Sequence, residues 1–376
     1  MNSPNSAQKL LLKAALLQGK LATYSWQQWK ASVDIENLDQ ESYQLLPLLY
    51  GNLSAHDVTD DHMGRLKGVY RRSWCENQVM LQNLTTILRC FQEAGIDTLL
   101  LKAAALNLNS SQDKALRMIN FLDILVHPAD ALKAMSLLQK LGWQPQGKIP
   151  EKLVPFAHVL GFKNPSNQYL NLRWHLFGDG FNQTVEKDFW NWAKLTQVGD
   201  ASAYILSPTD ALFYICVAGG EGNRTMPANR IADAAILLDS SQLEIDWHRL
   251  ISLAQTYHFV LPLKTTLSQL QDILNYPIPS SSFATIQNLP VSQFEAREYQ
   301  IVAGKKTPIL ERFLLRYFQY SRMVNSADYQ LKLLGFPRYL QYIWGVERLS
   351  QVPYQVIIRG IKRLVSADSL ANQRIN

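Results

Sequence analysis

The chain has 376 residues, of which 47% are hydrophobic and 18% charged, and its formal net charge is +6 at pH 7. This balance excludes an intrinsically disordered protein, because such chains combine low hydrophobicity with a high net charge. No stretch reaches the roughly 18 consecutive apolar residues of a membrane-spanning helix, so no transmembrane segment is expected. A chain of this length rarely folds around one core, so two or three packed subdomains are expected.

The cysteines and the N-terminus indicate a cytoplasmic protein. Cys75, Cys90 and Cys216 are odd in number, far apart and in no metal-binding spacing, which is typical of reduced thiols. The N-terminal segment lacks the basic start and the small-residue cleavage pattern of a signal peptide. Its apolar run is broken by Lys13 and Gln18, which favours an amphipathic helix.

The first part of the chain has the periodicity of helices. Apolar residues recur at three- and four-residue spacing over residues 7–30 and 62–94, which predicts two amphipathic helices. We therefore expect an N-terminal helical region over residues 1–89.

The pattern then changes to that of an α+β core, expected over residues 90–200. The apolar run Thr98–Leu101 predicts a strand, and a second strand is expected over 117–126, where the following His-Pro ends it. A helix then runs to Gly142, which caps it. Two further β-prone segments cover 152–160 and 168–177, joined by a turn-rich KNPSN sequence.

Helical periodicity returns beyond residue 205 and predicts a helical domain over residues 201–300. The expected helices begin near Ser207, Asn229, Asp246 and Val260, and a Pro/Ser-rich linker is expected over 273–290. Residues 301–376 are expected to form a basic helical C-terminal region. From residue 309 onward ten Lys/Arg face four Asp/Glu, a surplus of six that equals the net charge of the whole chain.

The motifs of the core resemble a known family in their order and spacing. The chain reads LLLKAAAL at 99–106, LRMINFLDILV at 116–126, LGW at 141–143 and LNLRWHL at 170–176. These segments resemble the LLKGAAL, RPMGDIDLLV, LGY and VDLHWRL patterns of the bacterial family of uncharacterised nucleotidyltransferases. That family is a distant branch of the polymerase-β-like nucleotidyltransferase superfamily. The resemblance implies an α+β fold with a nucleotidyltransferase-like mixed β-sheet core between N-terminal and C-terminal helical regions.

The resemblance also implies a reaction, the transfer of a nucleoside monophosphate from a nucleoside triphosphate (NTP) to an acceptor. Such a transfer requires neutralisation of negative charge, which Mg²⁺ ions held by carboxylates supply. In a strand, residues two apart point to the same face, so Phe121 and Asp123 share one side of the sheet. A relative with acids at both positions would hold Mg²⁺ there, with a third acid from a neighbouring strand.

This chain departs from that pattern at four positions. Phe121 stands where the family has the first acid, Asn171 where it has the third, and only Asp123 is retained as a metal ligand and catalytic carboxylate. Arg173 replaces a histidine, and Ala103 replaces a glycine that leaves room for a phosphate. Two of the three expected carboxylates are therefore replaced by side chains that bind Mg²⁺ poorly or not at all.

Three cations remain as candidate nucleotide-binding residues, because Lys102, Arg117 and Arg173 could together bind a triphosphate by charge. The alternative is that Lys102 and Arg117 form ion pairs with Asp123 and Asp113. Asp233 has the same two possibilities, since it either faces the cleft or pairs with Arg230 on its own helix.

Three functions therefore stay open. The first is a nucleotidyltransferase acting on an unknown acceptor. The second is an inactive scaffold of the same fold that binds a nucleotide or a partner protein. The third is a module that binds RNA or a membrane surface through the basic C-terminus, for which the alternative is a solvated helical face.

Overall fold

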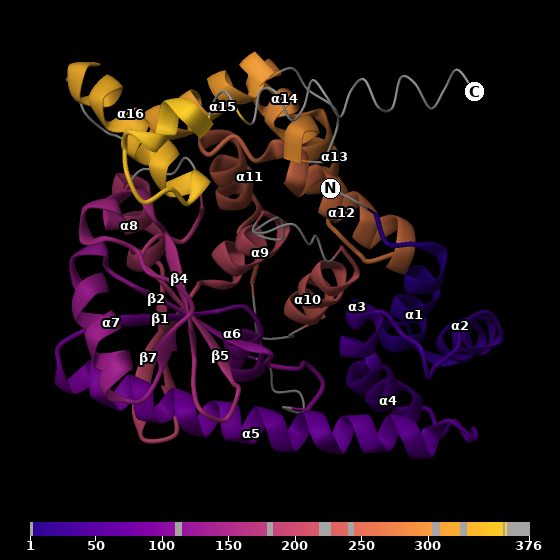
Figure 1. Ribbon diagram of the computed structural model, residues 1–376. Helices are drawn as coiled ribbons and strands as arrows, with labels where there is room; N and C mark the ends of the chain where they lie inside the picture. The colour runs from indigo at the N-terminus through magenta and orange to yellow at the C-terminus, as the bar shows by residue number, and fades with distance from the viewer. Residues whose placement is uncertain are drawn as a thin grey trace, which may run out of the picture.

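The computed structural model describes residues 3–109, 115–178, 183–217, 227–239, 244–302, 309–323, 329–355 and 358. One seven-stranded mixed sheet lies among helices that come from both ends of the chain (Figure 1). The expected α+β fold with a mixed β-sheet core is thereby confirmed. No helix in the described ranges has the length and apolarity that a bilayer crossing requires.

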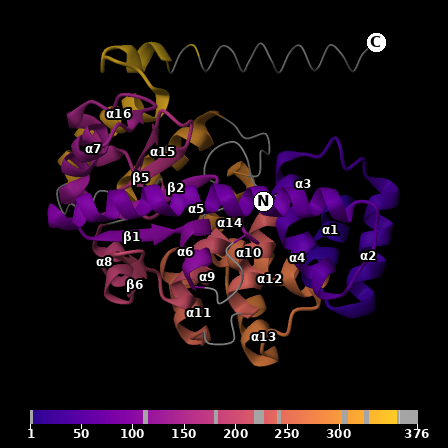
Figure 2. The same ribbon diagram turned by 90° about the horizontal axis from the view of Figure 1, so that it is seen from below.

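The N-terminal region is helical, as expected, but its first helix is interrupted. The chain turns at Gly19, whose φ of +61° is left-handed, so two helices replace the single one predicted over 7–30. The helices of this region are α1 (Ser6–Leu16), α2 (Gly19–Ser32), α3 (Gln40–Gln44), α4 (Leu46–Ala55) and α5 (Met63–Glu93). Helix α5 runs from the N-terminal helices to the underside of the sheet in both views (Figures 1 and 2).

The sheet has the strand order β3-β4-β5-β2-β1-β7-β6. Its strands are β1 (Thr98–Leu101), β2 (Phe121–Val126), β3 (Gln144–Pro145), β4 (Val159–Lys163), β5 (Tyr169–Arg173), β6 (Lys194–Val198) and β7 (Ala201–Ile205). Strand β2 pairs antiparallel with β1 and parallel with β5, and β1 pairs parallel with β7. The two central strands were predicted from the sequence, and β1 has the predicted bounds.

Two predictions about the sheet need correction. Most of the β-prone segment at 152–160 forms a 3₁₀ helix (Glu151–Phe156), because Pro155 cannot donate to a ladder, and β4 starts later. The β6–β7 hairpin was not predicted, and it extends the sheet past residue 200, where the core was expected to end.

The two faces of the sheet are buried against different helices. Leu100, Ile124 and Leu172 point toward α5 and α7 (Ala131–Lys140) in one core cluster. Their neighbours in the strands, Leu99 and Leu125, point toward the larger cluster built from the N-terminal helices and the helical domain. This alternation follows from the two-residue period of a strand. It places Asp123 on the face that the helical domain covers.

The helical domain follows the predicted helices closely. The remaining helices are α6 (Lys102–Asn109), α8 (Gln183–Asn191), α9 (Pro208–Val217), α10 (Pro227–Asp239), α11 (Trp247–Thr256), α12 (Val260–Leu274), α13 (Ser280–Asn288), α14 (Gln293–Val302), α15 (Ile309–Met323) and α16 (Tyr329–Trp344). The linker predicted over 273–290 is wrong, since it contains α13. This helix forms because Pro279 sets its start and the fully buried Ile286 packs into the core.

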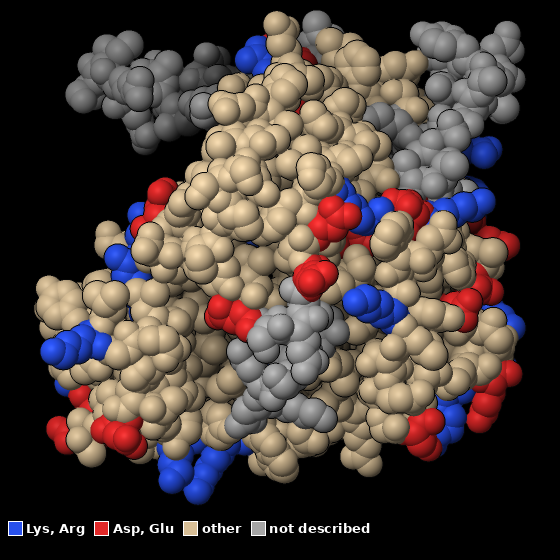
Figure 3. Space-filling view, turned by 180° about the vertical axis from the view of Figure 1, so that it is seen from behind, with Lys and Arg blue, Asp and Glu red and all other residues tan. Residues whose placement is uncertain are grey.

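Charged residues are unevenly spread over the surface. Viewed from behind, few of them lie over the upper part of the molecule, where α11 to α13 run (Figure 3). No charged residue occurs between Asp272 and Glu295. Elsewhere in this view acidic and basic side chains are interspersed rather than gathered in one basic patch. Much of the basic C-terminus, from residue 359 onward, lies outside the described residues.

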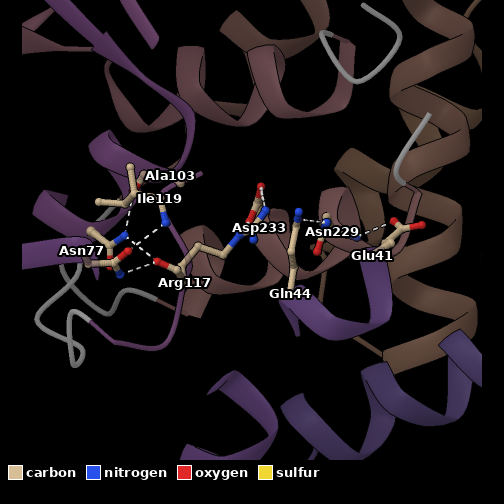
Figure 4. A network of polar contacts seen from close by, with 9 residues as sticks. Glu41, Gln44, Asn77, Ala103, Arg117, Ile119, Asn229 and Asp233 are labelled. Carbon is tan, nitrogen blue, oxygen red and sulfur yellow. Dashed lines mark hydrogen bonds and ion pairs between the residues drawn. The ribbon is translucent and has the colours of Figure 1, made fainter. Parts of the chain in front are cut away.

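Asn77 joins α5 to the chain that leads into β2. It is 1% exposed, its Oδ1 accepts from the backbone N–H of Ile119 at 2.8 Å, and its Nδ2 donates to the carbonyl of Arg117 at 2.9 Å (Figure 4). Asn107 of α6 donates to the same carbonyl at 2.9 Å. One buried amide therefore fixes where β2 begins.

We expect Asn77→Ala to lower the free energy of unfolding by about 1–3 kcal/mol, because it leaves a buried N–H without its acceptor. Urea denaturation followed by circular dichroism measures this change. Gln82→Ala, an exposed position of the same helix, is the matched control and should leave stability nearly unchanged. Equal stabilities of the two variants would contradict the role assigned to Asn77.

Candidate functional site

The strand register brings the predicted site residues of β2 and β5 to one face. Asp123 is paired with Leu101 of β1 and with Asn171 of β5, and Phe121 is paired with Tyr169. Because β2 and β5 are parallel and in register, their side chains form two adjacent rows. One row consists of Asp123 and Asn171, and the other of Phe121 and Tyr169. Asp123, Phe121 and Asn171 thus lie on one side of the sheet, as the spacing predicts.

Asp123 is held by three nitrogen donors. Its Oδ1 accepts from Lys102 Nζ at 3.1 Å, from Arg173 Nε at 3.1 Å and from Asn171 Nδ2 at 3.2 Å. We call these four residues the Asp123 centre. Asp123 is 3% exposed and the side chain of Arg173 4%, whereas that of Lys102 is 37% exposed. Two of the predicted nucleotide-binding cations are therefore partners of the only retained acid.

These contacts determine the charge state of the carboxyl. Burial by itself would raise the pKa of Asp123, because a dry environment penalises the charged form. The charges of Lys102 and Arg173, with their hydrogen bonds, outweigh burial and hold the pKa of Asp123 below its ordinary value of 3.8. Asp123 is therefore a carboxylate at neutral pH, and two cations already neutralise it.

Lys102 reaches the centre from a strained backbone position. It follows β1 directly and has a φ of +55°, in the left-handed region that residues with a side chain rarely adopt. Such a conformation costs on the order of 1 kcal/mol and persists only when its surroundings enforce it. The contact of its ammonium with Asp123 supplies part of that enforcement. Helix α6 begins at Lys102 itself.

Phe121 is on the surface beside this centre. Its side chain is 44% exposed and packs against Tyr169, itself 37% exposed, with ring centroids 5.5 Å apart. Lys163 of β4 pairs with Tyr169 in the ladder, and its Nζ lies 5.3 Å from the centroid of the tyrosine ring. Phe121 is thus part of an aromatic pair, and sequence reasoning missed Tyr169 and Lys163.

Arg117 is engaged by a different acid. Its Nε donates to Asp233 Oδ1 at 2.5 Å and its Nη2 to Asp233 Oδ2 at 3.2 Å, so the pair is bidentate (Figure 4). Asp233 lies on α10, so this ion pair joins the core to the helical domain. Asp233 was expected either to face the cleft or to pair with Arg230, and neither expectation included its partner Arg117. Asp113, the alternative partner of Arg117, lies outside the described residues.

The donor set of the Asp123 centre does not fit a magnesium ion. Mg²⁺ requires near-octahedral oxygen ligands at about 2.0–2.1 Å. Here one carboxylate oxygen is surrounded by two cationic groups and an amide nitrogen, and Phe121 offers no oxygen. A divalent ion at Asp123 would meet two positive charges within a few ångströms, in a site that water screens poorly. Among the described residues, no group of three His, Cys, Asp or Glu could hold a metal ion.

Comparisons with known proteins agree with this architecture. A family model described as "Uncharacterised nucleotidyltransferase" matches residues 40–275. The chain belongs to this family. The match includes α5, the whole sheet and the helical domain through α12. No curated protein matches the chain.

Three solved structures are similar over parts of the chain. The lincomycin-bound lincosamide antibiotic adenylyltransferase LnuA is 16% identical with a TM-score of 0.30, and the match covers 42% of this chain and 96% of that one. An antigenic nucleotidyltransferase-like protein from Paracoccidioides brasiliensis is 11% identical with a TM-score of 0.33, over 60% of this chain and 97% of that one. The Megavirus polyadenylate synthase is 12% identical with a TM-score of 0.30, over 83% of this chain and 57% of that one. TM-scores this low indicate weak structural similarity, so no function is inferred from these three structures.

We expect Asp123→Asn to destabilise the fold by about 3–5 kcal/mol, because it leaves the buried Arg173 without its counter-charge. Urea denaturation at pH 7 measures the difference. The matched control is Asp200→Asn, whose acid pairs with Arg89 on the surface and should change stability little. A stability of Asp123→Asn equal to the wild type would show that the carboxylate does not hold the sheet and helix together.

The same pair of proteins carries a pH signature. A group whose pKa is lowered on folding contributes stability above its unfolded pKa, and this contribution is lost as pH falls through its folded pKa. The stability gap between wild type and Asp123→Asn should therefore stay constant from pH 7 to about 5 and close only in strong acid, below about pH 4. A gap that closes already near pH 6 would contradict the lowered pKa.

Proposed function

We propose that this chain binds a nucleoside triphosphate without a carboxylate-held magnesium ion and does not transfer the nucleoside monophosphate. The observation that supports this most is the engagement of Asp123 Oδ1 by Lys102, Asn171 and Arg173. The protein's own cations stand where relatives with three acids would place metal ions. The chain is then an inactive member of its family that keeps a binding function.

Family membership favours a nucleotide as the ligand. The matched segment, residues 40–275, contains the sheet and the Asp123 centre. The centre has one acid and two bases, which leaves one net positive charge on a face bordered by Lys163. A polyanion is favoured at such a place because cationic groups form strong hydrogen bonds with phosphate oxygens.

Lys102 and Arg173 have different parts in this proposal. Arg173 is buried and holds Asp123, so it keeps the centre intact. Lys102 is more than one-third exposed, and its ammonium has three donors, so it contacts Asp123 and a phosphate at the same time. Arg117 holds α10 through Asp233 and, in this proposal, positions the helical domain over the sheet.

The charges at the Asp123 centre disfavour catalysis. Transfer of a nucleoside monophosphate builds negative charge on in-line oxygens, and carboxylate-held metal ions are the family's means of stabilising it. With a phenyl ring at 121 and an amide at 171, the two missing carboxylates cannot be supplied by neighbouring acids of the described residues. We propose that a partner protein recognises the nucleotide-bound form of the chain.

A cytoplasmic location and binding of RNA or membranes through the C-terminus stay predictions from the sequence. The interspersed charges on the face shown in Figure 3 favour neither RNA binding nor membrane binding. A single compact polyanion at the Asp123 centre is the better-supported ligand.

We expect ATP, GTP, CTP and UTP to raise the melting temperature of the wild type, and a chelator to leave that shift undiminished. Mass action gives about 2.7 kcal/mol of stabilisation at a ligand concentration one hundred times the Kd. Lys102→Gln should abolish most of the shift, whereas Lys140→Gln, an exposed lysine of α7, should keep it. Differential scanning fluorimetry and a pyrophosphate-release assay measure binding and turnover together.

Stabilisation that appears only with Mg²⁺, or pyrophosphate release that depends on Asp123, would contradict the proposal and favour an active nucleotidyltransferase. The absence of any shift with all four nucleotides would favour a scaffold without a nucleotide.

Restoring the acids tests the placement of the site. The double variant Phe121→Asp/Asn171→Asp puts three carboxylates on adjacent rows of one face, so it should bind nucleotides more tightly with Mg²⁺ than with a chelator. Isothermal titration calorimetry compares both conditions. The control is Trp192→Asp, an exposed aromatic position outside β2 and β5. A folded double variant with no metal response would refute the placement.

A further inference from the structure

An aromatic pair lies on the surface next to the Asp123 centre. Phe121 and Tyr169 are 44% and 37% exposed, and they are paired in the ladder at the first residues of β2 and β5. Large exposed aromatic side chains placed together are unusual on a sheet face, because burying them is favourable. Such a pair marks a surface that a ligand covers.

The ring of Tyr169 has two neighbours. Phe121 packs against it with an interplanar angle of 44°, and Lys163 Nζ lies over it, 5.3 Å from the centroid. The ammonium is held by the electrons of the ring, an interaction that also fixes its position. Phe121 is the more exposed ring of the pair, and Tyr169 with Lys163 borders it.

The pair is one row away from the Asp123 centre on the same face. Side chains two residues apart in a strand are separated by roughly 7 Å, which is the distance from the aromatic row to the row of Asp123 and Asn171. Strand β4 contributes Gly161 opposite Asn171, and the exposed side chain of Gln146 lies beside this glycine and borders the space between the rows. Lys102, from the start of α6, borders the same space through Asp123.

We propose that Phe121 and Tyr169 are the stacking platform for the base of the bound nucleotide, with its phosphates between Lys102 and Lys163. This inference rests on the proposed function, because it assigns the base and the phosphates of that ligand to two adjacent rows. A ribose bridges rows at this spacing. The residue that removes the family's first metal ligand thus supplies a binding surface in exchange.

The platform predicts a broad specificity. Stacking on an aromatic ring tolerates every base, since each has a π face, and it is stronger for the larger purines. No side chain of the platform offers a hydrogen-bond pattern that distinguishes adenine from guanine. ATP and GTP should therefore bind with similar affinity, and both more tightly than CTP or UTP.

The test compares ATP with inorganic tripolyphosphate, which carries the charges without the base. Isothermal titration calorimetry on the full chain should show that Phe121→Ala weakens ATP binding about five- to one hundred-fold and leaves tripolyphosphate binding unchanged. Phe121→Leu, which keeps apolar area but loses the aromatic face, should be intermediate. Tyr24→Ala, a 64% exposed aromatic position on α2, is the matched control and should bind ATP as the wild type does.

Tyr169→Ala should weaken ATP binding and, by releasing Lys163 from its ring, reduce tripolyphosphate affinity slightly as well. All substituted side chains are exposed, so the variants should melt near the wild-type temperature. Wild-type affinity for ATP in both Phe121→Ala and Tyr169→Ala would overturn the platform and leave the proposed function standing. Failure of the wild type to bind both ATP and tripolyphosphate would overturn the two together.

Discussion

The carboxylate of Asp123, placed between the side chains of Lys102 and Arg173, is the interaction on which the rest of the site depends. It is buried in the middle of the sheet and would be costly there without its partners. Arg173 supplies a buried counter-charge from the neighbouring strand, and Asn171 adds a further donor. The same contact helps to hold the left-handed backbone of Lys102, the first residue of α6.

We propose that this arrangement lets the fold keep its architecture while the chemistry of the site differs from that of relatives with three acids. In such a relative, the resemblance implies cations bound between the carboxylates. In this chain the protein's own cations neutralise the carboxylate of Asp123. In this proposal, side chains that are always present replace an ion that must be acquired. The cost is that the oxygen of Asp123 is no longer available to a metal, and the gain is a rigid centre with one net positive charge.

Much of the core could be predicted from the sequence, because its signals are local. The apolar run before Lys102 gave β1, and the two-residue period of strands placed Phe121 and Asp123 on one face. The β6–β7 hairpin was missed because its first strand is mostly exposed and lacks a clear apolar alternation. Helix α13 was missed because proline and serine are typical of linkers, and only tertiary packing of Ile286 favours a helix there.

The partners of the site residues were harder to predict, because they are distant in the sequence. Arg117 and Asp233 are 116 positions apart, and no local pattern pairs them. Tyr169 and Lys163 became visible only once the register of β4, β5 and β2 was fixed. Phe121, an aromatic residue two positions before Asp123, was the one sequence signal that pointed to the proposed platform.

The most direct measurement of the central claim is a crystal structure of the wild type with ATP and Mn²⁺, analysed by anomalous scattering of manganese. Lys102 and Arg173 should stay on Asp123 Oδ1, and no manganese peak should lie within coordination distance of that oxygen. A manganese ion bound between Asp123 and the phosphates, with Lys102 displaced, would contradict it.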